Sequence, residues 1–152
     1  RSLHSNVSFP EILSVGILDE FDAAPILEGP QATPTDHYGF SQENGVINID
    51  GQWFTNYVVG PIFADINNGD GTVITAEQQM TDYKTQKDIT QALLIRQQRD
   101  QKLSDCDWTQ VADVPNNINK NEWASYRQSL RDLPTSNGFP WTMVWPNPPT
   151  SK

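Results

Sequence analysis

The chain has 152 residues and a formal net charge of -9, with 36% hydrophobic and 19% charged residues. This length suffices for one modest domain or two small ones, and eleven prolines and nine glycines indicate much irregular backbone. Residues 1–76 carry ten acidic side chains against the single Arg1, which argues against a basic surface for nucleic acid or an anionic membrane. We therefore expect protein partners, with no nucleic acid and no membrane.

Cysteine usage and hydropathy limit the class further. Cys106 is the only cysteine, which excludes an internal disulfide framework and a cysteine zinc cluster. No apolar run reaches the ~20 residues of a membrane-spanning helix, and the amino end lacks a signal-peptide pattern, so we expect a cytosolic origin. Residues 6–8 match a glycosylation sequon, which we interpret as a chance match.

A β-hairpin is the clearest strand signal in the first half. Residues 1–45 hold short apolar pieces divided by prolines and predict an extended, irregular segment. Two strand-forming runs, 46–49 and 52–59, then flank Asp50 and Gly51, which suit a type I′ turn. The register of this hairpin pairs Ile47 with Phe54 and Asn48 with Trp53.

Residues 65–72 resemble the start of a calcium-binding EF-hand loop, with alternating oxygen-bearing side chains. Counted from Asp65, however, the sixth position is Asp70 instead of glycine and the twelfth is Ala76 instead of glutamate. The sharp turn and the bidentate ligand are both displaced, so we predict a solvated turn and no metal site.

A long helix is predicted over about residues 76–105. Thr75 and Gln78 form a capping box, and basic residues gather near the far end. Its apolar residues are few and crowd into one central patch, so most of its surface must meet water or polar partners. We interpret it as a helix connecting two modules; self-association is the alternative, but a sustained heptad pattern is absent.

A second helix is specified at both ends. Asn119 can cap its start with Glu122 three residues later, and Pro134 ends it. Four apolar residues spaced 3, 4 and 3 apart lie on one face and should be buried. These are Trp123, Tyr126, Leu130 and Leu133.

The chain closes with a Trp- and Pro-rich segment, residues 138–146, which we expect to be extended. Trp141, Met143 and Trp145 would then alternate onto one face. Prolines at both ends forbid a central strand, which leaves an edge strand or an arm laid over this protein or a neighbour.

The sequence offers no catalytic constellation. His4 and His37 lie in loop-like sequence without a nucleophile nearby. Cys106 lies between Asp105 and Asp107, whose negative charge discourages thiolate formation. We therefore expect no enzyme, no catalytic residue and no cofactor.

Aromatic residues concentrate in the last 45 residues and allow two interpretations. They can be the core of a small module, which needs large side chains to bury enough area, or anchors for a partner. We expect a core role for Trp108, Trp123 and Tyr126, and leave both roles open for Trp141 and Trp145.

Three segments in this order resemble the phage tail assembly chaperone-like family. They are residues 107–115 (DWTQVADVP), 123–133 (WASYRQSLRDL) and 139–141 (FPW), and residues 6–10 more weakly resemble the start of companion tail-associated proteins. The resemblance implies a module of small phage tail proteins and of the ends of fibre-like ones, with no catalytic residues and no cofactor. The positions that match are Trp108, Trp123, Tyr126, Arg127, Leu130, Arg131 and Trp141. Arg127 and Arg131 could pair with Asp107 or Asp113, or with a neighbouring subunit.

Together these patterns predict an α+β protein in three parts. A β-rich portion with a hairpin covers residues 1–74, a connecting helix covers 75–106, and a small helical module with an extended Trp/Pro-rich arm covers 107–152.

The leading functional hypothesis is a non-enzymatic structural component of a tailed bacteriophage virion, in the tail, neck, fibre or baseplate. It would be assembled in the host bacterial cytoplasm, oligomeric in the assembly, and bound to other phage structural proteins, because proline-rich ends gain order by docking. The alternative is a transient tail assembly chaperone absent from the mature particle, and a receptor- or carbohydrate-binding module is third. The predicted interaction residues are Trp108, Trp123, Tyr126, Arg127, Arg131, Trp141 and Trp145.

Overall fold

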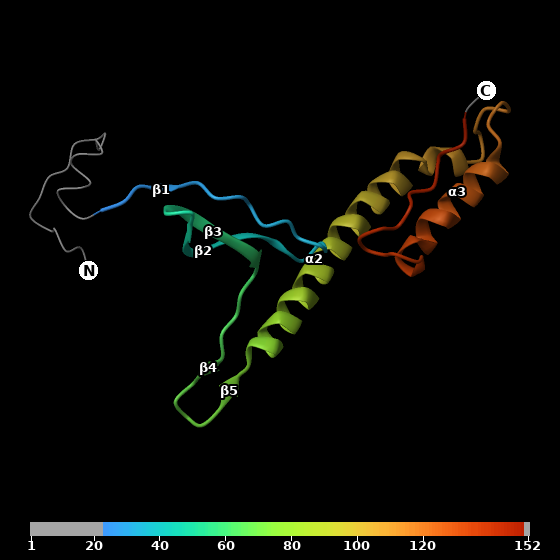
Figure 1. The fold of residues 1–152 in the computed structure, drawn as a ribbon. Helices are drawn as coiled ribbons and strands as arrows, with labels where there is room; N and C mark the ends of the chain where they lie inside the picture. Colours follow the sequence, from blue (N-terminus) through green and yellow to red (C-terminus); the bar gives the residue numbers. More distant parts are fainter. Residues whose placement is uncertain (1–22, 151–152) are drawn as a thin grey trace, which may run out of the picture. The chain divides into compact units, whose positions relative to one another are not determined.

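The computed structural model describes residues 23–150 and has the predicted α+β architecture, with a small sheet followed by a long helix and a short carboxy-terminal helix (Figure 1). It divides into two compact units, one ending at Ile62 and one beginning at Phe63. The long helix falls in the second unit, and the three-part division of the sequence stays a prediction. The proposals for His4 and residues 6–10 lie outside the described residues.

The first unit holds a three-stranded sheet. Its strands are β1 (Ile26–Leu27), β2 (Phe40–Ile49) and β3 (Gln52–Gly60), in the order β1-β3-β2. β3 pairs with β2 antiparallel and with β1 parallel. The sequence in this unit therefore gives a hairpin with one short added strand.

The predicted hairpin is confirmed down to its register. Asp50 has φ 51° and Gly51 has φ 83°, the left-handed backbone that a type I′ turn requires at both central positions. The side chain of Asn48 supports the turn, since its Oδ1 accepts a hydrogen bond from the Gly51 amide at 3.1 Å. The pairs next to the turn are Ile47 with Phe54 and Asn48 with Trp53, as predicted.

β2 begins at Phe40, within the stretch predicted to be irregular. The register shifts between Glu43 and Val46, where Gly45 has φ 73°. The glycine breaks the strand pattern in the sequence, but in the structure it forms a β-bulge that lets the ladder continue on both sides.

The second unit opens with a short two-stranded ladder, β4 (Ile66–Asn67) and β5 (Val73–Ile74), joined by a turn. In that turn Asp70 Oδ1 accepts a hydrogen bond from the Thr72 amide at 2.8 Å. Asp65 Oδ1 accepts one from the Ala76 amide at 2.7 Å, at the start of the next helix. Both carboxylates thus bond to nearby backbone, in agreement with the predicted turn.

The long helix α2 (Ala76–Asp105) has the predicted bounds. Thr75 caps it, with its side chain accepting a hydrogen bond from the Gln78 amide at 3.2 Å. Only Ala92 and Ile95 are buried along its 30 residues, which agrees with its thin apolar content.

The second helix, α3 (Lys120–Asp132), is also as predicted. The side chain of Asn119 accepts hydrogen bonds from the Asn121 and Glu122 amides at 3.1 and 3.3 Å. Pro134 ends the α-helix, and the chain tightens into the 3-10 helix η2 (Leu133–Thr135).

A small core forms where α3 packs on the end of α2. Its buried members are Cys106, Tyr126 and Leu130, with Leu103, Trp123 and Trp145 packed against them. The 3-10 helix η1 (Asp107–Gln110) links the two helices and places Thr109 fully inside. The predicted inward face of α3 is confirmed.

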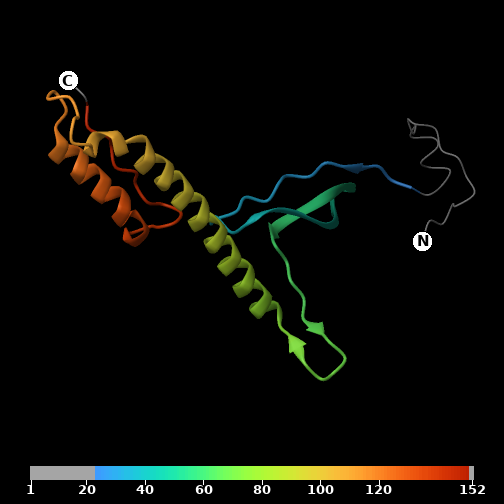
Figure 2. The ribbon, with the colours of Figure 1, turned by 180° about the vertical axis from the view of Figure 1, so that it is seen from behind.

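The carboxy-terminal segment starts differently from the prediction. The amides of Trp141 and Thr142 donate to the Gly138 carbonyl at 2.9 and 2.7 Å, and Gly138 has φ 83°, so residues 138–142 form a tight turn and the expected extended start is wrong. From residue 143 the chain is extended without pairing as a strand. Both ribbon views show this arm, coloured red, running back along α2 (Figures 1 and 2). Of the predicted alternatives, the arm laid over this protein is the one observed.

Candidate interaction site

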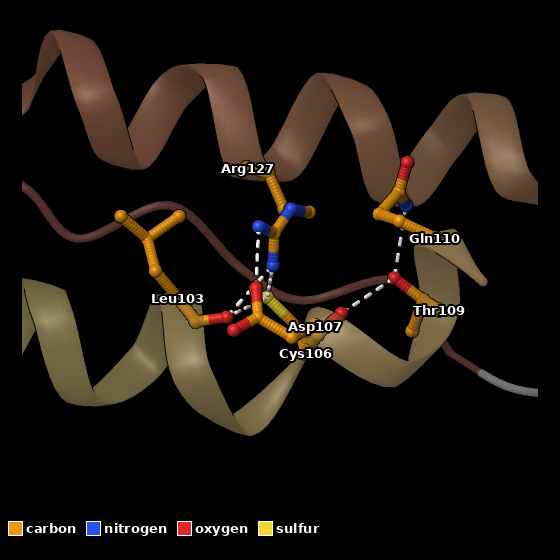
Figure 3. Close-up of polar contacts among 6 residues, drawn as sticks. All are labelled: Leu103, Cys106, Asp107, Thr109, Gln110 and Arg127. Carbon is orange, nitrogen blue, oxygen red and sulfur yellow. Dashed lines mark hydrogen bonds and ion pairs between the residues drawn. The ribbon is translucent and has the colours of Figure 1, made fainter.

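Arg127 joins α3 to the carboxy-terminal end of α2. Its Nη1 donates to the Leu103 carbonyl at 2.7 Å and to Cys106 Sγ at 3.1 Å. Its Nη2 donates to Asp107 Oδ1 at 2.6 Å. Figure 3 shows the guanidinium reaching from α3 to these three residues at once. One side chain therefore ties both helices and η1 together.

The electrostatics of this junction are favourable. The last carbonyls of a helix lack intrahelical donors and carry the negative end of its dipole, so a cation there is stabilised. Burial works to lower the pKa of Arg127, but the hydrogen bonds to Asp107 and Cys106 outweigh it and raise that pKa. The Arg127 side chain is 10% exposed and that of Asp107 is 65% exposed, so water reaches the pair from the Asp107 side.

Cys106 and Thr109 complete the junction from within. The Cys106 thiol donates to the Leu103 carbonyl at 3.2 Å, and the Thr109 hydroxyl donates to the Cys106 carbonyl at 2.7 Å (Figure 3). Gln110 Nε2 in turn donates to the Thr109 hydroxyl at 2.9 Å. Cys106 is only 3% exposed, so its role here is to pack and to satisfy a helix end. Our sequence reasoning missed this role, although the position of Cys106 directly after the long helix was a signal for it.

An aromatic row runs from the surface into the core. The ring centroids of Trp108 and Trp123 lie 6.1 Å apart, and those of Trp123 and Tyr126 lie 5.7 Å apart in an edge-to-face arrangement. Tyr126 is buried, and that burial raises the pKa of its hydroxyl. Trp108 is 47% exposed, in contrast to the core role predicted for it.

A hollow of about 310 Å³ lies beside this row. Ile118 and Trp123 line one part of it, Pro149 of the arm lines another, and Glu122 adds a carboxylate. Together with the exposed Trp108, the hollow gives the module an aromatic surface beside a partly open cavity. We call Trp108, Trp123 and this hollow the aromatic surface.

The turn at residues 138–142 and the arm after it are held on α2 by three aromatic contacts. Trp141 Nε1 donates to Asp88 Oδ1 at 2.6 Å. Farther along the helix, Arg96 lies 5.3 Å from the centroid of the Phe139 ring, and Lys102 lies 5.3 Å from that of Trp145. Met143 and Trp145 are partly buried and Val144 between them is 85% exposed, so the predicted alternation holds from residue 143 on, whereas Trp141 lies in the turn before it.

The structure thus brings five of the seven predicted interaction residues to one end of the module, around the core and Arg127. These five are Trp108, Trp123, Tyr126, Arg127 and Trp145. Trp141 lies farther along α2, at Asp88. Arg131 is exposed, and no ion pair of its side chain occurs among the described residues. A partner role for these residues stays a prediction.

Two kinds of site were searched for in the described part of the chain. Within residues 23–150, no group of three or more His, Cys, Asp or Glu side chains is placed to hold a metal ion. No helix in the same stretch combines the length and apolar character needed to cross a bilayer. What the surface offers a ligand is aromatic area with a polar rim.

Comparisons with known proteins bear on this same region. Residues 92–150 match the family of phage tail assembly chaperone proteins, which confirms the resemblance read from the sequence for this part of the chain. A search of curated proteins and a search of solved structures each found no match. The matched range begins at Ala92, the first buried residue of α2, and ends with the arm.

Proposed function

Because residues 92–150 match the phage tail assembly chaperone family, we propose that this chain is a non-enzymatic chaperone of phage tail assembly. It would bind another phage tail protein through its carboxy-terminal module. The observation that carries the proposal is the coincidence of the matched range with a structural module that has its own core.

The aromatic surface is the part of this module best suited to a partner. Trp108 is 47% exposed and contacts the Trp123 ring at a tilted angle, and Trp123 in turn contacts the buried Tyr126. Because the contact with Trp123 already restricts the Trp108 side chain, Trp108 loses little conformational freedom on binding. Tryptophan is also enriched at interface hot spots. We therefore propose that Trp108 inserts into an apolar pocket of the partner.

A transient role fits the observed arm better than a permanent one. The sequence favours a permanent neighbour because a proline-rich end gains order by docking. In the structure the carboxy-terminal segment docks on its own chain, through Trp141 in the turn and Trp145 in the arm. The module needs no neighbour to order this segment, so it can bind a partner and release it.

The second candidate is a permanent component of the virion. It is supported by the sheet of the first unit, where no apolar side chain between residues 23 and 62 is buried. A sheet of so few strands gains stability by packing against something else. In a mature particle a neighbouring subunit would supply that cover.

Quantitative mass spectrometry separates the two candidates. The protein would be counted against the major capsid protein in purified, DNA-filled particles and, in parallel, in infected cells during assembly. Abundance in cells with loss from the particles supports the transient chaperone. A fixed, symmetry-compatible copy number in the particles refutes that role and supports the virion component.

Complementation tests the aromatic surface. A phage that lacks this gene would be supplied with the wild-type chain, with Trp108→Ala, or with Val144→Ala as the matched control, since Val144 is also exposed. We expect Trp108→Ala to reduce the yield of complete tails at least tenfold while the control restores it. Equal yields with the two variants, at equal protein levels, would exclude Trp108 as the anchor.

A further inference from the structure

The arm, residues 143–150, is held on its module by the packing of a few side chains. Among the residues that the structure describes, no hydrogen bond joins the arm to another segment. Trp145 is the main anchor, because its ring packs against the core and Lys102 lies 5.3 Å from the ring centroid. Pro149 makes a second contact, where it lines the hollow at Trp123.

The arm fills its seat only in part. None of its residues is fully buried. An open hollow of about 480 Å³ lies beside Trp145 and is lined by Gln98 and Gln101 of α2, and the hollow of about 310 Å³ lies at Pro149. We call the surface under and beside the arm, between Lys102 and the hollow at Trp123, the arm site. The arm site is larger than the segment that occupies it.

Prolines allow the arm to leave and return at a small conformational cost. Pro146, Pro148 and Pro149 supply three of its eight residues. Proline fixes φ and lacks an amide N–H, so the segment stays extended when free and cannot be bonded to α2 through these positions. A segment that is already extended loses little freedom on docking, and docking is then reversible.

The arm itself shows which chemistry the arm site accepts. It is an uncharged segment in which Trp145 reaches the core and Pro149 reaches the hollow. An extended segment of another chain with the same features would make the same contacts. The match to the tail assembly chaperone family extends to Thr150, so the arm is part of the matched module.

We infer that the arm is a displaceable strap, and that an extended, uncharged partner segment with tryptophan followed by proline binds the arm site in its place. A second copy of the chain offers the same segment, but its arm is docked on its own module at the high effective concentration of a short tether. A different partner whose segment is free competes better. The inference rests on the proposed function for the statement that this partner is a phage tail protein.

The tether sets the size of the effect. The arm follows directly on the turn at residues 138–142, so it acts on the arm site at an effective concentration on the order of 1 mM. We expect an open site to bind a free segment with one aromatic anchor with a dissociation constant on the order of 100 μM. The docked arm then weakens the binding of that segment by about tenfold.

Fluorescence anisotropy with a labelled peptide tests the inference on the full chain. The peptide is MVWPNPPT, the sequence of residues 143–150. Trp145→Ala removes the anchor of the strap and should bind the peptide about tenfold more tightly than the wild type. Val144→Ala is the matched control, because Val144 is 85% exposed, and it should bind like the wild type. A peptide with alanine in place of its tryptophan should not bind.

A second variant guards against loss of the fold. Trp145→Phe keeps an aromatic ring on the core and should still bind the peptide at least twofold more tightly than the wild type. Circular dichroism verifies that each variant remains folded, and if Trp145→Ala does not, Trp145→Phe decides.

Three outcomes would overturn the inference. Folded Trp145 variants that bind the peptide no more tightly than the wild type would show that the arm masks no site. Equal binding of the alanine peptide would place the contact outside the arm site. A wild-type chain that dimerises at about 1 mM in sedimentation equilibrium, when Trp145→Ala does not, would assign the arm site to the arm of a second copy. Because the assay contains no other phage protein, its result is independent of the copy-number and complementation experiments.

Discussion

Replacing Arg127 with alanine removes the side chain that joins α3 to the end of α2. The Leu103 carbonyl keeps the Cys106 amide and thiol as donors but loses its charged one. Asp107 loses its ion pair, yet its side chain is 65% exposed and is rehydrated by water. The substitution therefore removes the contacts of Arg127 and leaves no unpaired charge buried.

The magnitude follows from these contacts. A hydrogen bond from a charged group contributes about 1.5–3 kcal/mol, and an ion pair open to water adds up to about 1 kcal/mol. Allowing for the donors that Leu103 retains, we expect Arg127→Ala to lower the free energy of unfolding of the second unit by about 2–3 kcal/mol. For a unit of this size that corresponds to a fall of roughly 10–20 °C in melting temperature.

Urea unfolding monitored by tryptophan fluorescence measures the free energy of unfolding of the second unit. Four of the five tryptophans lie in it: Trp108, Trp123, Trp141 and Trp145. Arg131→Ala is the matched control, since this arginine is one turn further along α3 and exposed. The control should stay within about 0.5 kcal/mol of wild type. If Arg127→Ala does the same, the junction does not stabilise the module and the reasoning is wrong.

Three further predictions concern single contacts. Trp145→Ala should lower the free energy of unfolding by about 2 kcal/mol because its ring packs on the core, whereas the exposed Val144→Ala should change it by less than about 0.5 kcal/mol in the same urea assay. Burial raises the pKa of Tyr126 above its ordinary value of about 10, so the stability of the second unit should be full below about pH 10 and fall above it. Tyr126→Phe should reduce that fall. Identical stability profiles against pH for the variant and the wild type would refute the role of Tyr126. Hydrogen bonds from the Thr72 hydroxyl and amide hold the pKa of Asp70 below its ordinary value of about 4, so the β4–β5 turn should loosen only in more acid solution. Thr72→Val should raise the Asp70 pKa in an NMR titration, and an unchanged pKa would refute the contact.

Local signals in the sequence determined the hairpin and the two helices, because turn and capping residues mark where these elements begin or end. Asp50 and Gly51 required the left-handed turn that fixes the hairpin register. Thr75 and Asn119 set the starts of the two helices, because a capping side chain bonds to amides only two or three residues away. The same short range explains why the start of β2 at Phe40 was not predicted. A glycine such as Gly45 interrupts a strand pattern in the sequence whether the strand ends there or continues past a bulge.

The tertiary structure decided the contacts between residues distant in sequence. The sequence left Arg127 several partners, and packing of α3 on α2 selected Asp107 and added Cys106, 21 residues away. The sequence left open whether Trp141 and Trp145 pack in the core or bind a partner. In the structure the turn at Gly138 places both side chains against their own chain. Spacing along a chain reports which face a side chain occupies, but which surface meets that face depends on how the elements pack, and no local pattern encodes that.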